Sequence, residues 1–210
     1  IFIDISSRQI RNLHLYTSVF IDEIYMCQMF DDEKQSNFWS YKLGARASNL
    51  LPNTSLTVEY THNNPLTYTH IYPSTTFESN GYGMGHYLRD NAEEIYVAVR
   101  YKPIRGLDLQ LSYTQARKGE EYQKVIDSED FTFYPEINTE EPRWGLPFIK
   151  ETLWKKKSIN LSARYQIIND LFIFAQLEHQ KISGTKAANY SLPFELSNEN
   201  SVWFGLNFGF

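Results

Sequence analysis

Residues that commonly perform chemistry are scattered along this 210-residue chain. His62 and His70 lie near Glu59 and Glu78, but this spacing matches no metal-ligand pattern. The glycine-rich stretch "GYGMGHY" at 81–87 is not followed by a predicted helix, so we interpret it as a flexible loop and not as a phosphate site. We therefore expect no metal, no cofactor and no catalytic centre. A hydrolase remains an alternative, because Ser, His and Asp are all present.

The chemistry that the sequence favours is the binding of sugars. The long loops between the predicted strands also carry Tyr, Phe and Trp, amid Asn, Asp, Glu and Arg. Aromatic faces pack against the C–H faces of sugar rings, and planar polar groups hydrogen-bond to hydroxyls. The alternative for each aromatic residue is that it packs the loops into a lid.

The composition excludes several classes of protein. The net charge of -5 and the absence of a basic cluster beyond "KKK" at 155–157 argue against nucleic-acid binding. No apolar run approaches the ~20 residues of a membrane-spanning helix. Cys27 is the single cysteine, so an intrachain disulfide is excluded. An aromatic content of 16% is typical of a β-rich protein with aromatic girdles.

Alternation of apolar and polar residues recurs along the chain and predicts an all-β, antiparallel fold of about nine strands. After a short opening strand at 1–6, we expect strands over 13–22, 41–48, 56–61, 95–102, 107–114, 159–167, 171–178 and 202–210.

The connections alternate in length. They are short at "LLPNT", "KPIRGL" and "IIND", and long in the regions 29–37, 68–93, 118–148 and 183–198. Tight periplasmic turns and long extracellular loops are typical of a transmembrane β-barrel of the bacterial outer membrane, whereas a soluble sandwich shows no such rule. We expect residues 1–210 to belong to one barrel domain.

The direction of the strands predicts that this domain is incomplete at its N-terminus. If "IIND" is periplasmic, the last strand ends in the periplasm and the first arrives from outside. Bacterial single-chain barrels have an even number of strands. We therefore expect the chain to be the C-terminal portion of a longer precursor, with an odd number of strands upstream.

The two predicted faces of the sheet differ in charge. One face carries no charged residue, and we expect it to contact lipid. The other would fill the lumen with bulky rings and ion pairs, which disfavours a wide diffusion pore. The alternative is that this second face is the solvated side of an amphipathic sheet. The candidate lumen ion-pair residues are Asp22, Lys42, Arg46, Glu59, Arg100, Arg164 and Glu178.

The chain ends in "SVWFGLNFGF", which predicts a closing strand with an apolar face along its whole length. Such a strand cannot fray into a polar tail. Phe208 and the terminal Phe210 resemble the signal that the barrel-insertion machinery of the outer membrane reads.

The segment from Val58 to Gly119 resembles the Wzi-type capsule assembly family of the Bacteroidetes. The resemblance rests on "EYT" at 59–61, "YTH" at 68–70, "GHYLRDN" at 85–91 and "RKG" at 117–119, together with the Asp22-Glu23 pair. Arg89 stands where the family has glycine. The match covers about a third of the chain, and the remainder is similar only to barrels in general.

The resemblance implies a non-catalytic outer-membrane protein of a Gram-negative bacterium. It would assemble capsule or exopolysaccharide and attach it to the cell surface, by binding polysaccharide through its extracellular loops. The alternatives are a substrate-selective porin, the C-terminal part of a TonB-dependent receptor, and a secretion or assembly subunit that binds protein partners. The candidate binding residues are Tyr68, His70, Tyr72, Phe77, Tyr82, His86, Tyr87, Asn91 and Trp144.

Overall fold

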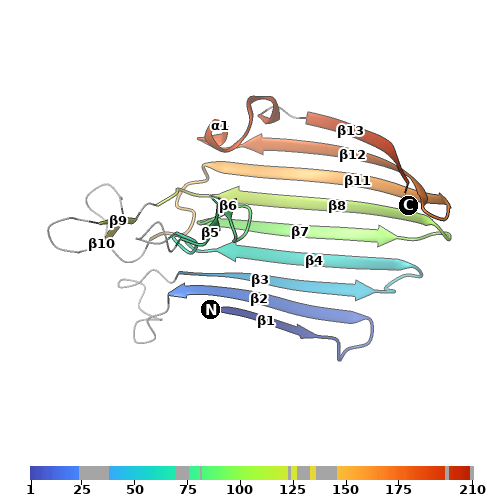
Figure 1. Ribbon diagram of the computed structural model, residues 1–210, viewed down its shortest axis with the longest axis horizontal. Coiled ribbons are helices and arrows are strands. Elements are labelled where there is room, and N and C mark those ends of the chain that lie inside the picture. The colour runs from blue at the N-terminus through green and yellow to red at the C-terminus, as the bar shows by residue number, and fades with distance from the viewer. Residues whose placement is uncertain are drawn as a thin grey trace.

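A computed structural model describes residues 1–23, 38–69, 76–80, 82–122, 124–126, 133–135, 146–196 and 199–208. Nine strands form one sheet in the order β1-β2-β3-β4-β7-β8-β11-β12-β13, which follows their order in the sequence (Figure 1). Every neighbouring pair of strands is antiparallel. The strands are β1 (Phe2–Ser7), β2 (Leu13–Glu23), β3 (Phe38–Ser48), β4 (Thr54–Asn63), β7 (Ala92–Tyr101), β8 (Leu107–Lys118), β11 (Trp154–Ile168), β12 (Leu171–Ser183) and β13 (Glu199–Phe208). The predicted all-β, antiparallel sheet of about nine strands is confirmed.

Smaller elements lie in the long connections. They are the hairpin of β5 (Glu78–Ser79) and β6 (Tyr82–Gly83), the pair β9 (Lys124–Ile126) and β10 (Phe133–Pro135), the helix α1 (Ala187–Tyr190) and a 3-10 turn at Pro193–Glu195. Within the described ranges, no helix has the length and apolar character needed to cross a membrane.

The short connections all lie at one end of the sheet, which we call the turn end, and the long ones lie at the other, the loop end (Figure 1). Each short turn contains a residue with positive φ, where Asn, Asp and Gly are favoured. These residues are Asn12, Asn49 and Asn53, Gly106 and Asp170. The alternation of connection lengths that the sequence predicted is therefore present in the fold.

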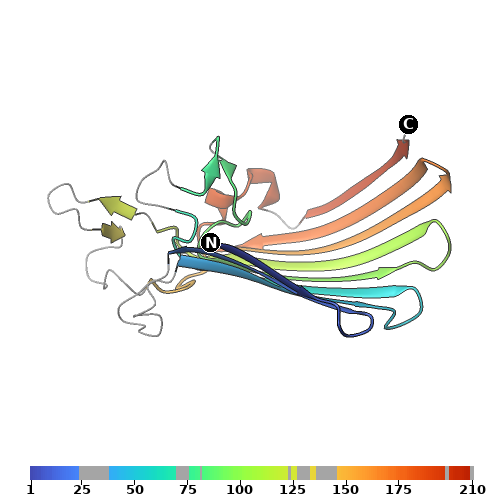
Figure 2. The same cartoon turned by 60° about the horizontal axis from the view of Figure 1, so that its bottom comes forward.

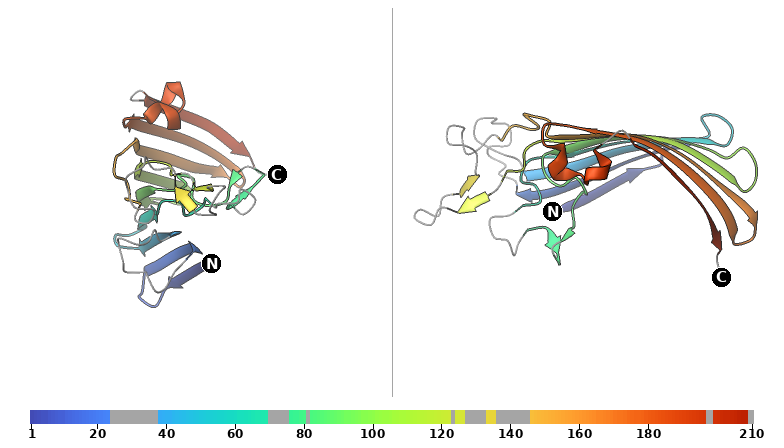
Figure 3. Two further views of the ribbon diagram at one scale, coloured as in Figure 1. Left: turned by 90° about the vertical axis from the view of Figure 1, so that its left-hand side faces the viewer. Right: turned by 90° about the horizontal axis from the view of Figure 1, so that it is seen from above.

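The sheet is bent into an arc. Viewed along the strands, β1 and β13 curve toward the same side (Figure 3). The β5–β6 hairpin and α1 lie on that concave side (Figure 2). β1 and β13 are the two edges of the described sheet.

Register separates the two faces as predicted. Leu15, Ala45 and Val58 are neighbours on one side, which we call the apolar face, and Tyr16, Gly44 and Glu59 are neighbours on the other, the polar face. Many large side chains of the apolar face are well exposed, among them Ile3, Ile5, Leu15, Leu43, Val58, Val99, Leu111, Ile159, Leu161, Ile173, Leu177, Val202, Phe204, Leu206 and Phe208.

The long connections pack on the polar face at the loop end. Trp154 of β11 and Ile182 of β12 form a small core with Leu88, and Tyr190 of α1 packs against it. The Trp154 indole N–H donates a hydrogen bond to Ser191 Oγ at 2.7 Å. A second small core consists of Phe38, Leu66, Tyr122 and Leu146. The two small cores thus lie on the concave, polar face, whereas on the apolar face Phe148 of the β8–β11 connection contacts His62 at the loop end, with 4.0 Å between ring centroids.

Candidate functional site

A cavity of about 410 Å³ lies between the polar face and the connection that joins β4 to β7. We call it the loop cavity. This volume is in the range of small-molecule sites. It brings together three of the predicted binding residues, Tyr68, Phe77 and His86. The other residues that line it include Phe2, Ser18, Phe20, Ser40, Lys42, Thr61, Asn63, Met84 and Gly85.

Three aromatic rings form one wall of the loop cavity. Phe20 comes from β2, and its ring centroid lies 4.7 Å from that of Phe77 and 5.4 Å from that of Tyr68. The rings of Tyr68 and Phe77 are stacked at 6.2 Å. Phe20 can reach the loop because it occupies the polar face close to the loop end of its strand, where it pairs with Ser40.

Polar groups of β3 and β4 line the same space. The hydroxyl of Tyr68 lies 2.7 Å from Ser40 Oγ, and it also donates to Asn63 Oδ1 at 3.4 Å. Lys42 Nζ lies 3.5 Å from Glu59 Oε2, and about a third of its side chain is exposed. The site therefore offers aromatic faces, hydroxyl groups and one cation within a single cavity, so it can both pack against an apolar surface and hydrogen-bond to polar groups.

Asp90 and Gly85 fix the position of Tyr68. One carboxylate oxygen of Asp90 accepts the backbone N–H of Tyr68 at 2.7 Å, and the other accepts the hydroxyl of Thr69 at 2.6 Å. A Cβ at Gly85 would stand 2.5 Å from the ring of Tyr68. Burial raises the pKa of the Tyr68 hydroxyl, so it stays protonated and can donate a hydrogen bond.

His86 is largely buried beside the loop cavity. Burial is the main cause that lowers the pKa of His86 to about 4. The Lys42 cation lowers this pKa further, and the negative charge of Glu59 raises it in part. Its ring is therefore neutral at pH 7 and can both donate and accept a hydrogen bond. Nε2 of His86 lies 3.8 Å from one carboxylate oxygen of Glu94. The other carboxylate oxygen of Glu94 accepts a hydrogen bond from the hydroxyl of Tyr87.

Asn91 occupies a different environment from the other candidates. Its side chain is fully buried. Its amide donates to the carbonyl of Glu120 at 2.8 Å and accepts from the N–H of Ile149 at 2.9 Å, while its own carbonyl accepts from Gly119 at 2.8 Å. These contacts connect two long loops, so in this structure the Asn91 amide is committed to holding loops together.

The remaining binding candidates are not all placed. Tyr82, in the β5–β6 hairpin, is 78% exposed, and Tyr87 is also exposed. Neither side chain lines the loop cavity. His70, Tyr72 and Trp144 lie outside the residues that the structure describes.

Of the predicted lumen ion-pair residues, Lys42 and Glu59 pair with each other, and Arg100 pairs with a residue outside the predicted set. Lys42 pairs with Glu59, whose carboxylate also accepts a hydrogen bond from Tyr16, and Arg100 pairs with Asp108. Arg164 lies over the ring of Phe172, with 3.9 Å between its guanidinium carbon and the ring centroid. Arg46 and Glu178 are on the polar face without a described ion pair, and Asp22 lies at the loop end of β2.

Phe208, of the predicted assembly signal, is exposed on the apolar face opposite Leu171, and Phe210 lies outside the described residues. In the part of the chain that the structure describes, no three His, Cys, Asp or Glu side chains come together in a way that could hold a metal ion.

Sequence reasoning missed Phe20, Ser40 and Met84 as residues of the site. Phe20 and Ser40 could have been found from the sequence pattern, because both lie on the polar face, near the loop end of a strand and beside a long connection. Met84 belongs to the connection itself, and its position depends on how the loop folds back.

Comparison with known proteins adds no relative: no family model matches the chain, and no curated protein sequence matches it significantly.

Proposed function

We propose that the nine strands form part of an antiparallel β-barrel in the outer membrane of a Gram-negative bacterium, with the apolar face against lipid. The observation that supports this location is the side on which the loops pack. In a soluble protein, loops or a second layer would cover the apolar face, because large exposed apolar patches are rare. Here they cover the polar face, and Phe204 and Leu206 are 84% and 71% exposed.

The distribution of charge on the apolar face agrees with a membrane crossing. Charged side chains on this face lie toward the loop end, at Glu93, Arg117, Lys155, Lys157 and Lys181. From there to the turns, the described residues of the face carry no charge. This distribution is that of strands whose loop ends extend beyond the hydrocarbon region.

Aromatic residues border the uncharged band. Tyr41 and Tyr60 contact each other near the loop end, with 6.0 Å between ring centroids, and Tyr101 and Tyr165 lie near the turn end. Tyr60 pairs with Ile95, and the distance from Ile95 to Tyr101 along β7 is roughly 20 Å at ~3.4 Å per residue. Strands in outer-membrane barrels are tilted by about 35–45°, so this length spans roughly 15 Å along the membrane normal, which fits within their ~25 Å apolar band.

A spanning sheet must also be closed, because lipid offers no partner for the backbone groups of an open edge. The free edges of β1 and β13 therefore require further strands between them, and strand parity predicts an odd number. Filling the polar face with rings is consistent with a small lumen: the ring of Tyr16 lies over Gly44, and that of Phe174 lies against Gly205.

We propose further that the protein binds capsule or exopolysaccharide at the loop cavity and holds it at the cell surface without a catalytic step. The combination of three aromatic rings with Ser40, Lys42 and the neutral His86 in one cavity is the observation that carries this function. The resemblance of 58–119 to the Wzi-type family supports it. Arg89, which stands where that family has glycine, has a φ of 58°, a conformation that favours glycine.

The test is deletion of the gene in the source bacterium, followed by measurement of capsule on the cell and in the medium. We expect polysaccharide to be made in normal amount but to be released into the medium. Normal attachment in the deletion strain would contradict the function. Stable single-channel conductance of the full-length protein in a planar bilayer would instead favour the porin alternative, and an upstream plug domain would favour the receptor.

A further inference from the structure

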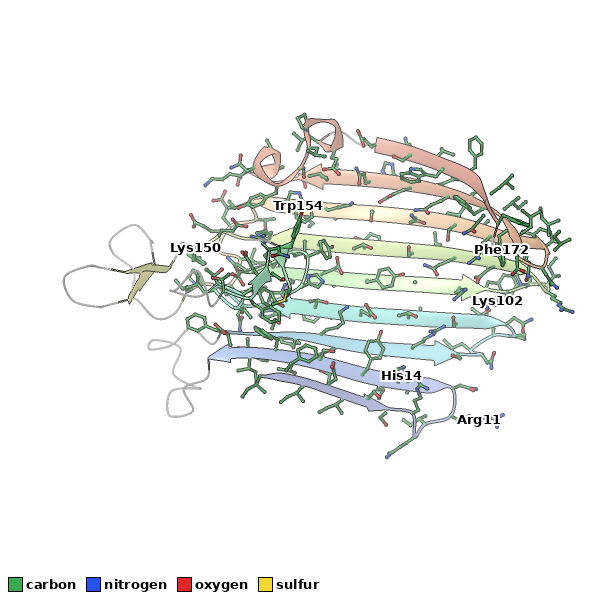
Figure 4. The ribbon with its side chains drawn as sticks, viewed as in Figure 1. Arg11, His14, Lys102, Lys150, Trp154 and Phe172 are labelled. Carbon is green, nitrogen blue, oxygen red and sulfur yellow. The ribbon has the colours of Figure 1, made fainter. Side chains whose placement is uncertain are left out.

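A second cavity, of about 550 Å³, lies at the turn end of the polar face, far from the loop cavity along the strands. We call it the turn-end groove. Its walls come from the β7–β8 turn and from β11 and β12. Figure 4 shows Lys102 and Phe172 together at this end of the sheet. The residues that line it include Asn53, Lys102, Arg105, Gly106, Asp108, Arg164, Gln166 and Phe172.

The turn-end groove has an excess of positive charge. Lys102, Arg105 and Arg164 line it, and its single acidic side chain, Asp108, is already neutralised. Arg100 donates two hydrogen bonds to the two oxygens of Asp108, and Lys102 Nζ lies 4.0 Å from the same carboxylate. Arg164 is the cross-strand neighbour of Asp108 and interacts with it electrostatically. Among the described residues, Arg105 and Arg164 form no ion pair within 4 Å, so the groove holds more cations than its one carboxylate can neutralise.

Arg164 is held in place before any ligand arrives. Its guanidinium carbon lies 3.9 Å from the centroid of the Phe172 ring, so the plane of the group is supported on one side. A guanidinium that lies on an aromatic ring keeps its N–H donors at its edge, where they can bind carboxylate or phosphate. Fixing the side chain in advance reduces the entropy lost on binding.

The wall of the turn-end groove is also fixed. The backbone N–H of Gln166 donates to the carbonyl of Gly106 at 2.9 Å, which attaches the β7–β8 turn to β11. Gly106 has a φ of 84°, and a Cβ there would stand 3.1 Å from the carbonyl oxygen of Gln166. The amides of Asn53 and Gln166 line the groove as neutral hydrogen-bonding groups beside the cations.

We propose that the turn-end groove binds the carboxylate or phosphate groups of an acidic saccharide. Arg164 and Arg105 would bind the anionic groups, and Asn53 and Gln166 would bind neighbouring hydroxyls. The anion chemistry follows from the groove alone, whereas the choice of a saccharide as its carrier rests on the proposed function. In the proposed barrel the groove faces the periplasmic end of the lumen, whereas the loop cavity faces the outside of the cell.

The experiment is titration calorimetry of the full-length protein, folded in a nonionic detergent. The ligands are tetragalacturonate, neutral maltotetraose and inorganic phosphate. We expect tetragalacturonate to bind at least about tenfold more tightly than phosphate, because adjacent carboxylates engage several cations, and maltotetraose not to bind the groove. Arg164→Gln should weaken tetragalacturonate binding by about tenfold, and added salt should weaken it further.

The matched control is Arg11→Gln, which removes a cation at the same end of the sheet, in the β1–β2 turn and outside the groove (Figure 4). It should leave the affinity for tetragalacturonate unchanged. Failure of the groove and failure of the proposed function are separable, because the first is measured by the affinity of Arg164→Gln for tetragalacturonate and the second by release of capsule from the deletion strain. Three results would overturn the proposal: equal affinity in Arg164→Gln and wild type, equal binding of the neutral and acidic tetrasaccharides, or phosphate binding as tight as tetragalacturonate.

Discussion

The ring of Tyr68 lies so close to Gly85 that a Cβ at residue 85 would stand 2.5 Å from a ring carbon. Gly85→Ala must therefore displace the ring, and with it the wall of the loop cavity. We expect overpacking to lower the free energy of opening of this loop by about 1–3 kcal/mol. Hydrogen exchange of the Phe77 amide, which donates to the Tyr68 carbonyl at 3.2 Å, measures that opening.

The control for this substitution is Gly83→Ala in the same hairpin. Among the described residues, a Cβ at Gly83 would meet the side chain of Arg89, at 3.7 Å, which is an ordinary contact. Gly83→Ala should leave exchange at Phe77 unchanged. Equal effects of the two substitutions would show that the contact between Gly85 and Tyr68 does not shape the loop cavity.

Asn91→Ala should loosen two long loops at once. The substitution leaves the part-buried N–H of Ile149 and the carbonyl of Glu120 without the amide that they bind, at a cost of about 0.5–1.5 kcal/mol for each lost hydrogen bond. We expect faster exchange at the amides of Gly119 and Ile149, measured against Asn189→Ala in the exposed helix α1, which should be neutral. Unchanged exchange at both amides would refute this role of Asn91.

The loop over the cavity should become less stable in acid. The folded pKa of His86, about 4, lies below the unfolded value of 6.5, so the unfolded state binds more protons between these values. Stability therefore falls as pH decreases from 6.5 to about 4, by about 2–3 kcal/mol for full titration. His86→Gln should remove this part of the pH dependence of loop opening, whereas the contribution of carboxylates such as Glu94 should persist. An identical pH profile in the variant would contradict the assignment to His86.

Charge at the centre of the apolar face should destabilise the protein in a membrane. Leu111 lies between Val99 and Leu161 and is half exposed. We expect Leu111→Arg to lower the free energy of unfolding in lipid vesicles by about 2–4 kcal/mol. Gln115→Arg, on the same strand and face but next to Lys157 at the loop end, should cost much less. If the two substitutions cost the same, the face does not contact lipid.

The strands and their faces could be predicted from the sequence because alternation is a local property. The predicted strand over 107–114 is part of β8, which extends to Lys118, and the one over 159–167 is part of β11, which begins at Trp154. The extra residues were missed because both faces become polar at the loop end, as in "KKK" at 155–157. Alternation disappears there although the backbone ladder continues.

The loop cavity could be predicted only in part. Aromatic content identified Tyr68 and Phe77, but their position over the polar face depends on Asp90, Gly85 and Phe20, which are distant in sequence or lack an individual signal. Asn91 was selected as a binding residue because it ends the "GHYLRDN" stretch on which the resemblance rests. Its burial depends on the β8–β11 connection, whose path the sequence does not reveal. The glycines of "GYGMGHY" suggested flexibility, whereas Gly85 provides room for a ring.

The most direct test of the proposed function is the affinity of full-length protein in detergent for capsular polysaccharide purified from its own source, in wild type and in two loop-cavity variants. Phe77→Ala removes a ring, and Lys42→Gln removes the cation. We predict saturable binding that each variant weakens by about tenfold, with Gly83→Ala unchanged. Absence of saturable binding, or equal affinity in wild type and both variants, would contradict the account.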